Sequence, residues 1–280
     1  MAVFGVLLLL IIVLYVTIGA IFISEDQANK TNVRSKFNPP SAEYPFGTDE
    51  VGRDVLARTI YGGQISLMIG VVSVTISVSL GTLVGLVTGY FGGIIDAILM
   101  RVVEALLAIP TLVLLLVISR SLQDIAMYNF NFFGRELSVS VLAIVAIIGL
   151  TSWMGLSRLV RSLVLSLKEQ DFILAAQALG ANNMRIIFRH ILPNTMAPVI
   201  VSATLGVGTA IIVEAALSFL GFGVVPPTAT WGNIITRARQ SVGELWWIWV
   251  FPGTFITMTV LAINFIGDGL RDALDPYSTK

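Results

Sequence analysis

The stretch from Thr59 to Ile95 reads TIYGGQISLMIGVVSVTISVSLGTLVGLVTGYFGGII and contains no charged side chain. A helix needs about 20 mostly apolar residues to cross a bilayer, so we expect a membrane-spanning helix at about residues 65–89. The alternation of apolar and polar residues that marks a membrane β-barrel is absent. Because only helices and closed barrels satisfy every backbone polar group in lipid, the stretch predicts a transmembrane helix.

Within this helix, five small residues follow one another at intervals of four. They are Ser73, Ser77, Gly81, Gly85 and Gly89. Residues at this spacing share one helix face, and small side chains on that face let two helix backbones approach closely. The pattern predicts a tight contact with a neighbouring helix.

Five further segments are long and apolar enough to span a membrane. They lie at about residues 2–23, 94–119, 137–157, 195–220 and 246–266. The whole chain is 56% hydrophobic and only 12% charged, whereas soluble domains carry about 25% charged residues. We therefore predict an all-α integral membrane protein with six transmembrane helices. An even number of spans leaves both termini on one side, and the basic residues divide too evenly between the two sets of loops to say which.

The composition also excludes several classes of function. A formal net charge of zero gives no electrostatic footprint for nucleic acid. The absence of cysteine and the single histidine, His190, exclude disulfide scaffolds and multi-histidine metal sites. No G-x-x-x-x-G-K-[ST] phosphate loop occurs, and there is no H-E-x-x-H motif. We therefore expect no enzyme active site and no bound cofactor or metal in this chain.

Charged residues inside the apolar segments are candidates for a gate or a pathway, because charge at membrane depth is costly. Glu214 lies within the fifth segment, and it either hydrogen-bonds a neighbouring helix or lines an aqueous path. Asp96, Arg101 and Glu104 lie near the start of the third segment. Arg101 and Glu104 can pair on one helix face, so this group is either an ion pair at the membrane edge or part of a pathway.

A polar connection at about residues 158–194 contains a short amphipathic helix. Asp171 is a suitable N-cap, and Gly180 is a suitable residue to end the helix. Four apolar residues between them share one face: Phe172, Ala175, Ala176 and Leu179. Two helical turns are not stable alone in water, so this helix must dock, either on its own membrane domain or on a partner.

The sequence DFILAAQALG at 171–180, followed by RHILPN at 189–194, resembles the EAA loop of ABC-importer permeases. The resemblance implies that the loop is cytoplasmic and that its short coupling helix sits in a cleft of the ATP-hydrolysing subunit. It extends the candidate coupling residues to Leu192 and Pro193. Leu174 stands where the family has an acidic residue, and His190 where it has isoleucine. Glu169 or Asp171 could supply the missing acidic contact.

Other segments resemble the second permease subunit of the dipeptide, oligopeptide and nickel importers. They are GTDEVGRD at 47–54, GYFGG at 89–93, LSFLG at 217–221, Pro226-Pro227 with Trp231-Gly232, and GDGLRDALDP at 267–276. The resemblance implies an N-terminal helix (1–23), an extracytoplasmic segment (24–64) and a type I ABC-importer core of five helices (65–280). It also implies a prokaryotic inner membrane with both termini in the cytoplasm, and it makes 24–64, 120–136 and 221–245 extracytoplasmic.

The first extracytoplasmic segment contains a candidate surface helix. Thr48 or Asp49 can cap it, and Val51, Val55, Thr59 and Ile60 share a stripe. By resemblance it lies near the outer mouth, where a substrate-binding protein docks. The candidate docking residues are Asp49, Glu50, Arg53 and Asp54. The alternative is that Asp49, Glu50 and Asp54 lie at the solvated start of a helix, where the helix dipole favours negative charge.

The resemblance implies a permease subunit that forms half of a translocation path and works by alternating access. The implied partners are a second homologous permease, two ATP-binding subunits that hold ATP and magnesium, and an extracytoplasmic substrate-binding protein. Peptides are the expected cargo, with nickel, glutathione, opines or another small solute as alternatives. A stand-alone secondary transporter that relays ions through Glu214 is the rival hypothesis, and it predicts inverted internal repeats.

Overall fold

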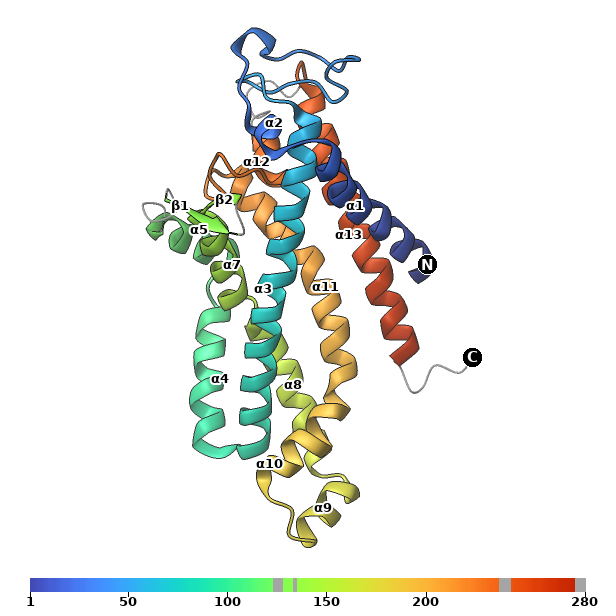
Figure 1. The fold of residues 1–280 in the computed structure, drawn as a ribbon. Coiled ribbons are helices and arrows are strands. Elements are labelled where there is room, and N and C mark those ends of the chain that lie inside the picture. Colours follow the sequence, from blue (N-terminus) through green and yellow to red (C-terminus); the bar gives the residue numbers. More distant parts are fainter. Residues whose placement is uncertain (123–127, 133–134, 237–242, 275–280) are drawn as a thin grey trace.

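The computed structural model of the protein describes residues 1–122, 128–132, 135–236 and 243–274. It is a helical bundle with one short antiparallel hairpin (Figure 1). The helices and strands in chain order are α1 (Ala2–Phe22), α2 (Glu25–Asn29), a 3-10 turn (Val33–Ser35), α3 (Val55–Phe91), α4 (Gly93–Leu107), α5 (Thr111–Ser121), β1 (Asn129–Phe132), β2 (Arg135–Ser138), α7 (Val139–Thr151), α8 (Trp153–Lys168), α9 (Asp171–Ala178), α10 (Asn183–Ile186), a π-helical turn (Ile187–Ile191), α11 (Leu192–Phe219), α12 (Trp231–Thr236) and α13 (Trp246–Leu274).

Helix α3 is the longest element of the described chain. Its 37 residues make a helix about 55 Å long, which exceeds the roughly 30 Å hydrocarbon core of a bilayer. Figure 1 shows it running from the end that carries α2 and α12 towards the end that carries α9 and α10. The helix begins at Val55, because the Asp54 side chain accepts hydrogen bonds from the backbone N–H groups of Leu56 (2.8 Å) and Ala57 (3.4 Å). The separate surface helix predicted around Thr48 and Asp49 is therefore absent, and its later residues form the first turns of α3.

Five helical stretches of the described chain are long and apolar enough to cross a membrane. They are Ala2–Phe22, Val55–Phe91, Val139–Lys168, Asn183–Phe219 and Trp246–Leu274. Helices α4 and α5 together give a sixth candidate, but they are bent by 88°. The continuous third helix predicted at 94–119 is therefore wrong in detail. The physical reason is Pro110, which has no N–H to donate and disfavours helical backbone at the residue before it.

The row of small residues in α3 makes the close helix contact that the sequence predicted, and the neighbours are α7 and α8. A Cβ atom added at Gly85 would lie 2.6 Å from Val160 Cβ, and one added at Gly89 would lie 2.7 Å from Val164 Cβ. Higher along the row, the Ser73 hydroxyl donates to the carbonyl of Val145 in α7 at 3.3 Å. Glycine is required at these crossings because any side chain would separate the two backbones.

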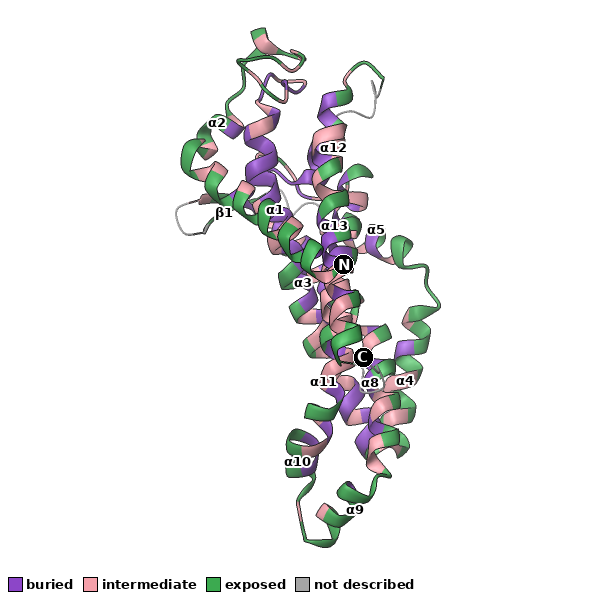
Figure 2. Ribbon diagram, turned by 90° about the vertical axis from the view of Figure 1, so that its right-hand side faces the viewer, coloured by how far each residue is buried: buried purple, intermediate pink, exposed green. Residues whose placement is uncertain are grey.

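Helices α1 and α13 run antiparallel beside the rest of the bundle (Figure 1). Tyr15 and Phe255 stack with ring centroids 4.6 Å apart, and Gly269 lies against Ala2. The first turn of α1 therefore lies beside the last turns of α13. Only 17% of the residues in the most apolar part of α1 are buried. Figure 2 shows exposed positions along α1 and α4. Exposed apolar side chains in this number suit a lipid environment.

Candidate functional site

Helix α9 projects from the end of the molecule opposite α2 and α12 (Figure 1). Its N-cap is Gln170, whose backbone is extended, and Asp171 is already the first helical residue. The prediction that Asp171 caps the helix is therefore wrong, and the side chain of Gln170 makes no capping hydrogen bond. Asp171 instead places a negative charge in the first turn, where the helix dipole favours it.

The C-terminal end of α9 has the geometry that the sequence predicted. Gly180 has a φ of +79°, a left-handed backbone that side chains with a Cβ rarely adopt. Its N–H donates to the carbonyl of Gln177 (2.9 Å), and the N–H of Ala181 donates to the carbonyl of Ala176 (3.0 Å). These two bonds form a Schellman motif, which ends the helix and satisfies its last carbonyls.

The predicted apolar face of α9 turns away from the bundle. Phe172 is 45% exposed and Leu179 is 89% exposed, while Ala175 is exposed and Ala176 half-buried. Ile173 is the one buried residue of the helix, and it packs in a cluster with Val164 and Ile186. Sequence reasoning missed Ile173, because nothing in a run of apolar residues distinguished it from Phe172.

A polar framework holds the loops on both sides of α9. The hydroxyl of Tyr90, near the end of α3, donates to Asn183 Oδ1 (2.9 Å), and Lys168 Nζ donates to the Tyr90 carbonyl (3.2 Å). The predicted coupling residue Leu192 packs against the Ile173 cluster, and Pro193 is exposed in the first turn of α11. The carbonyl of His190 accepts a hydrogen bond from Asn194 Nδ2 (2.6 Å). Residues 183–219 form one continuous helical stretch, so α9 is connected directly to the base of α11.

The charged group predicted at the start of the third span divides into two separate ion pairs. Asp96 in α4 binds Arg161 in α8 through two hydrogen bonds of 2.5 and 2.6 Å. Arg101 and Glu104 pair with each other at 3.4 Å, and their side chains are 84% and 60% exposed. The Arg101–Glu104 pair was predicted from its spacing. The partner of Asp96 was not, because Arg161 is distant in the sequence.

Glu214 lies inside the protein with only 1% of its surface exposed. Its Oε1 accepts hydrogen bonds from Ser218 Oγ (2.7 Å) and Thr230 Oγ1 (2.8 Å), and its Oε2 from Ser66 Oγ (3.5 Å). Ser66 Oγ also accepts the backbone N–H of Trp231 at 3.1 Å. The carboxyl group therefore joins α3, α11 and the start of α12.

The candidate docking residues at the other end of the molecule differ in exposure. Asp49 is 1% exposed, and its carboxylate binds Arg53 Nε (2.7 Å) and the backbone N–H groups of Val51 and Arg53. Asp49 and Arg53 thus organise a loop from inside, whereas Glu50 and Asp54 are partly exposed. Burial raises the pKa of the Asp54 carboxyl above its usual value. The hydrogen bonds from the backbone N–H groups of Leu56 and Ala57 lower this pKa, but by less.

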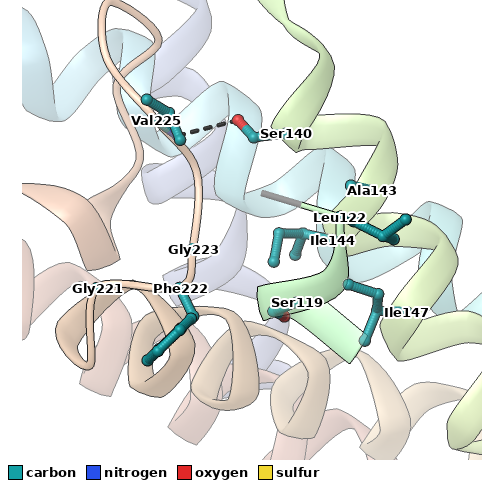
Figure 3. A pocket seen from close by; sticks show the side chains of 10 residues that line it. All are labelled: Ser119, Leu122, Ser140, Ala143, Ile144, Ile147, Gly221, Phe222, Gly223 and Val225. Carbon is teal, nitrogen blue, oxygen red and sulfur yellow. Dashed lines mark hydrogen bonds between the residues drawn. The ribbon is translucent and has the colours of Figure 1, made fainter. Parts of the chain in front are cut away.

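A small cavity lies between α5, α7 and the segment 221–225 (Figure 3). Its volume is about 20 Å³, which is room for about one water molecule. The Ser140 hydroxyl accepts the backbone N–H of Val225 (2.9 Å) at its edge, and the buried hydroxyl of Ser119 has no partner in the described part of the chain. The cavity suits a buried water and is too small for a cargo molecule.

Comparison with known proteins assigns the family. A family model described as "Binding-protein-dependent transport system inner membrane component" matches residues 81–279. The chain belongs to this family. It is a transmembrane permease of a binding-protein-dependent ABC importer, as the resemblance implied. The match covers α9, Glu214 and the Asp96–Arg161 pair.

Relatives of this permease extend over nearly the whole chain. A dipeptide transport system permease protein of Alkalihalophilus pseudofirmus is 42% identical over 276 residues, which is 99% of this chain and 86% of the relative. A Brucella suis protein whose name describes a peptide transport system permease is 43% identical over 272 residues, which is 97% of this chain and 86% of the relative.

The fold of the permease is also found among solved structures. A structure of the MetNI methionine ABC transporter, in an inward-facing conformation, has a TM-score of 0.58 to this chain at 21% identity. The similarity covers 76% of this chain and 94% of that one. It confirms the predicted helical type I importer fold.

Proposed function

We propose that this permease imports small peptides and that α9 is its coupling helix to an ATP-binding subunit. The peptide cargo is supported by the relatives at 42% and 43% identity, which are named as dipeptide and peptide permeases. The coupling role rests on one observation: the helix is anchored by Ile173, while its Phe172–Leu179 face is exposed.

The exposed face of α9 has the form of a docking surface. In a small helix surrounded by water, large apolar side chains such as Phe172 and Leu179 gain free energy when a partner covers them. The chain itself has no phosphate-binding loop, so ATP and magnesium belong to separate subunits. A cleft in such a subunit would receive the face, and a second permease would complete the pore.

The anchor of α9 explains how a movement of the helix would reach the membrane. Ile173 shares a packed cluster with Ile186 and Ile191, which lead directly into α11. Packed interiors transmit displacement because they have little free volume. When two ATP-binding subunits close, α9 would move, and α11 would tilt towards an outward-facing state.

This assignment also orients the chain. The α9 end faces the cytoplasm of a prokaryotic cell, together with both termini. The α2–α12 end faces outward, where a substrate-binding protein would dock near the partly exposed Glu50 and Asp54.

The coupling role is tested with two alanines of α9 in the complete importer. Ala175 lies on the docking face, and the exposed Ala178 lies about 110° around the helix from the middle of that face. Ala175→Arg should abolish the ATP hydrolysis that peptide-loaded binding protein stimulates, because a long cation cannot enter an apolar cleft. Ala178→Arg is the matched control and should keep most of the stimulation. Full stimulation in Ala175→Arg would refute the coupling role.

A further inference from the structure

A second, larger cavity lies at mid-depth in the bundle. Its volume is about 410 Å³, and it is bordered by α3, α11 and the junction of α7 with α8. Its polar lining residues are Ser73, Ser77, Ser152, Ser202 and Thr209, and Gly155 is one of its small ones. Pockets of a few hundred cubic ångströms are the size that holds a small ligand.

The wall of this cavity contains a one-residue break between two helices of a membrane-spanning stretch. α7 ends at Thr151 and α8 begins at Trp153, so the break at Ser152 falls midway along the stretch 139–168. The chain continues in the same direction there, because the Ser152 N–H still donates to the carbonyl of Ile148 (3.0 Å). Ser152 is exposed, and a Cβ atom added at Gly155 would meet nothing within 4 Å beyond its own helix backbone. The break therefore faces open space.

Two hydroxyl groups in the wall are free to bind something else. Ser77 and Thr209 donate to carbonyls of their own helices, Val74 at 3.1 Å and Leu205 at 3.3 Å. Ser152 and Ser202 have no side-chain hydrogen bond within the residues that the structure describes. A hydroxyl without a partner is unfavourable in an apolar environment, so both positions suit contact with water or a polar ligand.

The chemistry of the wall separates the candidate ligands. No charged side chain lines this cavity, and charge begins only in the adjoining cleft, which shares Gly155 and contains Glu104, Arg158 and Arg161. Across the described chain, no group of three or more His, Cys, Asp or Glu residues could hold a metal ion. Neutral hydroxyls match the amide and carbonyl groups of a peptide backbone, and they are poor ligands for a transition metal.

We propose that the residues lining this cavity, Ser152 and Ser202 among them, form part of the wall of the translocation path. The ligand that they bind is the uncharged backbone of a peptide. The inference rests on the proposed function, because it takes the cargo to be a peptide. It adds to that function the residues that the cargo touches.

The absence of native cysteine makes single-cysteine labelling a direct test. Ser152→Cys and Ser202→Cys place thiols in the cavity wall. Leu150→Cys and Ile200→Cys are the matched controls, because each lies two residues away on the opposite side of the same helical stretch and is exposed outside the cavity. Each variant is assembled with its partner subunits and treated in membranes with a membrane-impermeant methanethiosulfonate. Copurification of each variant with its partner subunits verifies that it is folded, and trialanine uptake before labelling is the reference for uptake afterwards.

We expect the two cavity thiols to react about tenfold or more faster than the controls, because only a hydrated thiol forms the reactive thiolate. Trialanine should slow their labelling, nickel chloride should not, and modification should block trialanine uptake. Equal rates in cavity and control variants would overturn the inference. So would modification that leaves uptake unchanged, or protection by nickel and not by trialanine.

Failure of the proposed function would look different. If the unmodified importer does not take up trialanine, the peptide assignment fails for the whole transporter. The rate difference between Ser152→Cys and Leu150→Cys would still decide whether this cavity is a hydrated path.

Discussion

Asp96 and Arg161 are joined by two hydrogen bonds of 2.5 and 2.6 Å although they are 65 residues apart in the sequence. The pair connects the start of α4 to the cytoplasm-proximal half of α8 in our proposed orientation. Neither side chain is fully buried: Arg161 is 32% exposed and Asp96 is 18% exposed. Solvent therefore weakens the attraction, while the bidentate geometry strengthens it.

The first prediction concerns this pair. Asp96→Asn and Arg161→Gln should each lower stability by about 1 kcal/mol or less. Because both substitutions remove the same interaction, the double variant should be little less stable than the less stable of the two single variants. Thermal unfolding in detergent measures all three. The equivalent cycle on Arg101 and Glu104, an exposed pair, should show no measurable coupling, and additive losses at Asp96 and Arg161 would contradict the contact.

The second prediction concerns the crossing of α3 and α8. Gly85→Ala should destabilise the protein by about 1–3 kcal/mol, because the added methyl lies 2.6 Å from Val160 Cβ and overpacks the contact. Val160→Ala in the same chain should restore little of the loss, because Val160 Cβ and the Ser157 carbonyl oxygen, 2.7 Å from the added methyl, both remain. The control is Gly155→Ala, where the methyl enters open space. Detergent-based thermal unfolding checks the order, and equal stability of the two alanine variants would be inconsistent with close packing at Gly85.

The third prediction concerns Glu214. Glu214→Ala removes the acceptor of three hydroxyl donors, which should cost about 1–3 kcal/mol for each donor left unsatisfied in the interior. Glu214→Gln keeps one acceptor oxygen and similar size, so it should retain most of the stability and transport. Ser218→Ala removes a single donor to the carboxylate and should have a smaller effect. If Glu214→Gln abolishes transport while folding normally, a proton-carrying role returns as the better explanation.

The fourth prediction separates the anchor of α9 from its docking face. Ile173→Ala leaves a void in the cluster with Ile186, a change that costs about 2–5 kcal/mol in well-packed cores. Because the docking face is unchanged, the ATP-binding subunits should still copurify, but stimulated ATP hydrolysis should fall. Leu174→Ala, at a 50% exposed position on the same helix, is the control and should stay coupled. Normal stimulation in Ile173→Ala would show that the cluster does not transmit the movement.

Some features of this permease follow from short stretches of sequence. The uncharged run from Thr59 to Ile95 predicted the central part of α3, because the requirement to satisfy backbone groups in lipid acts within one helix. Gly180 predicted the end of α9 for a similar reason, since a left-handed residue needs only its own missing Cβ. The spacing of Gly81, Gly85 and Gly89 predicted that α3 packs closely, though it did not identify α8 as the neighbour.

The tertiary structure decided which residues meet across the bundle. Arg161 as the partner of Asp96, Ser66 and Thr230 as partners of Glu214, and Ile173 as the buried side of α9 all depend on contacts between distant segments. Local propensity carries no information about such contacts, because each side chain would suit several partners equally well. Asp49 illustrates the same limit. Its sequence context suited an exposed helix cap, and only the folding of its loop onto Arg53 placed it inside. Hydropathy and backbone preference therefore determined where the chain crosses the membrane, and packing between helices decided what each polar group does there.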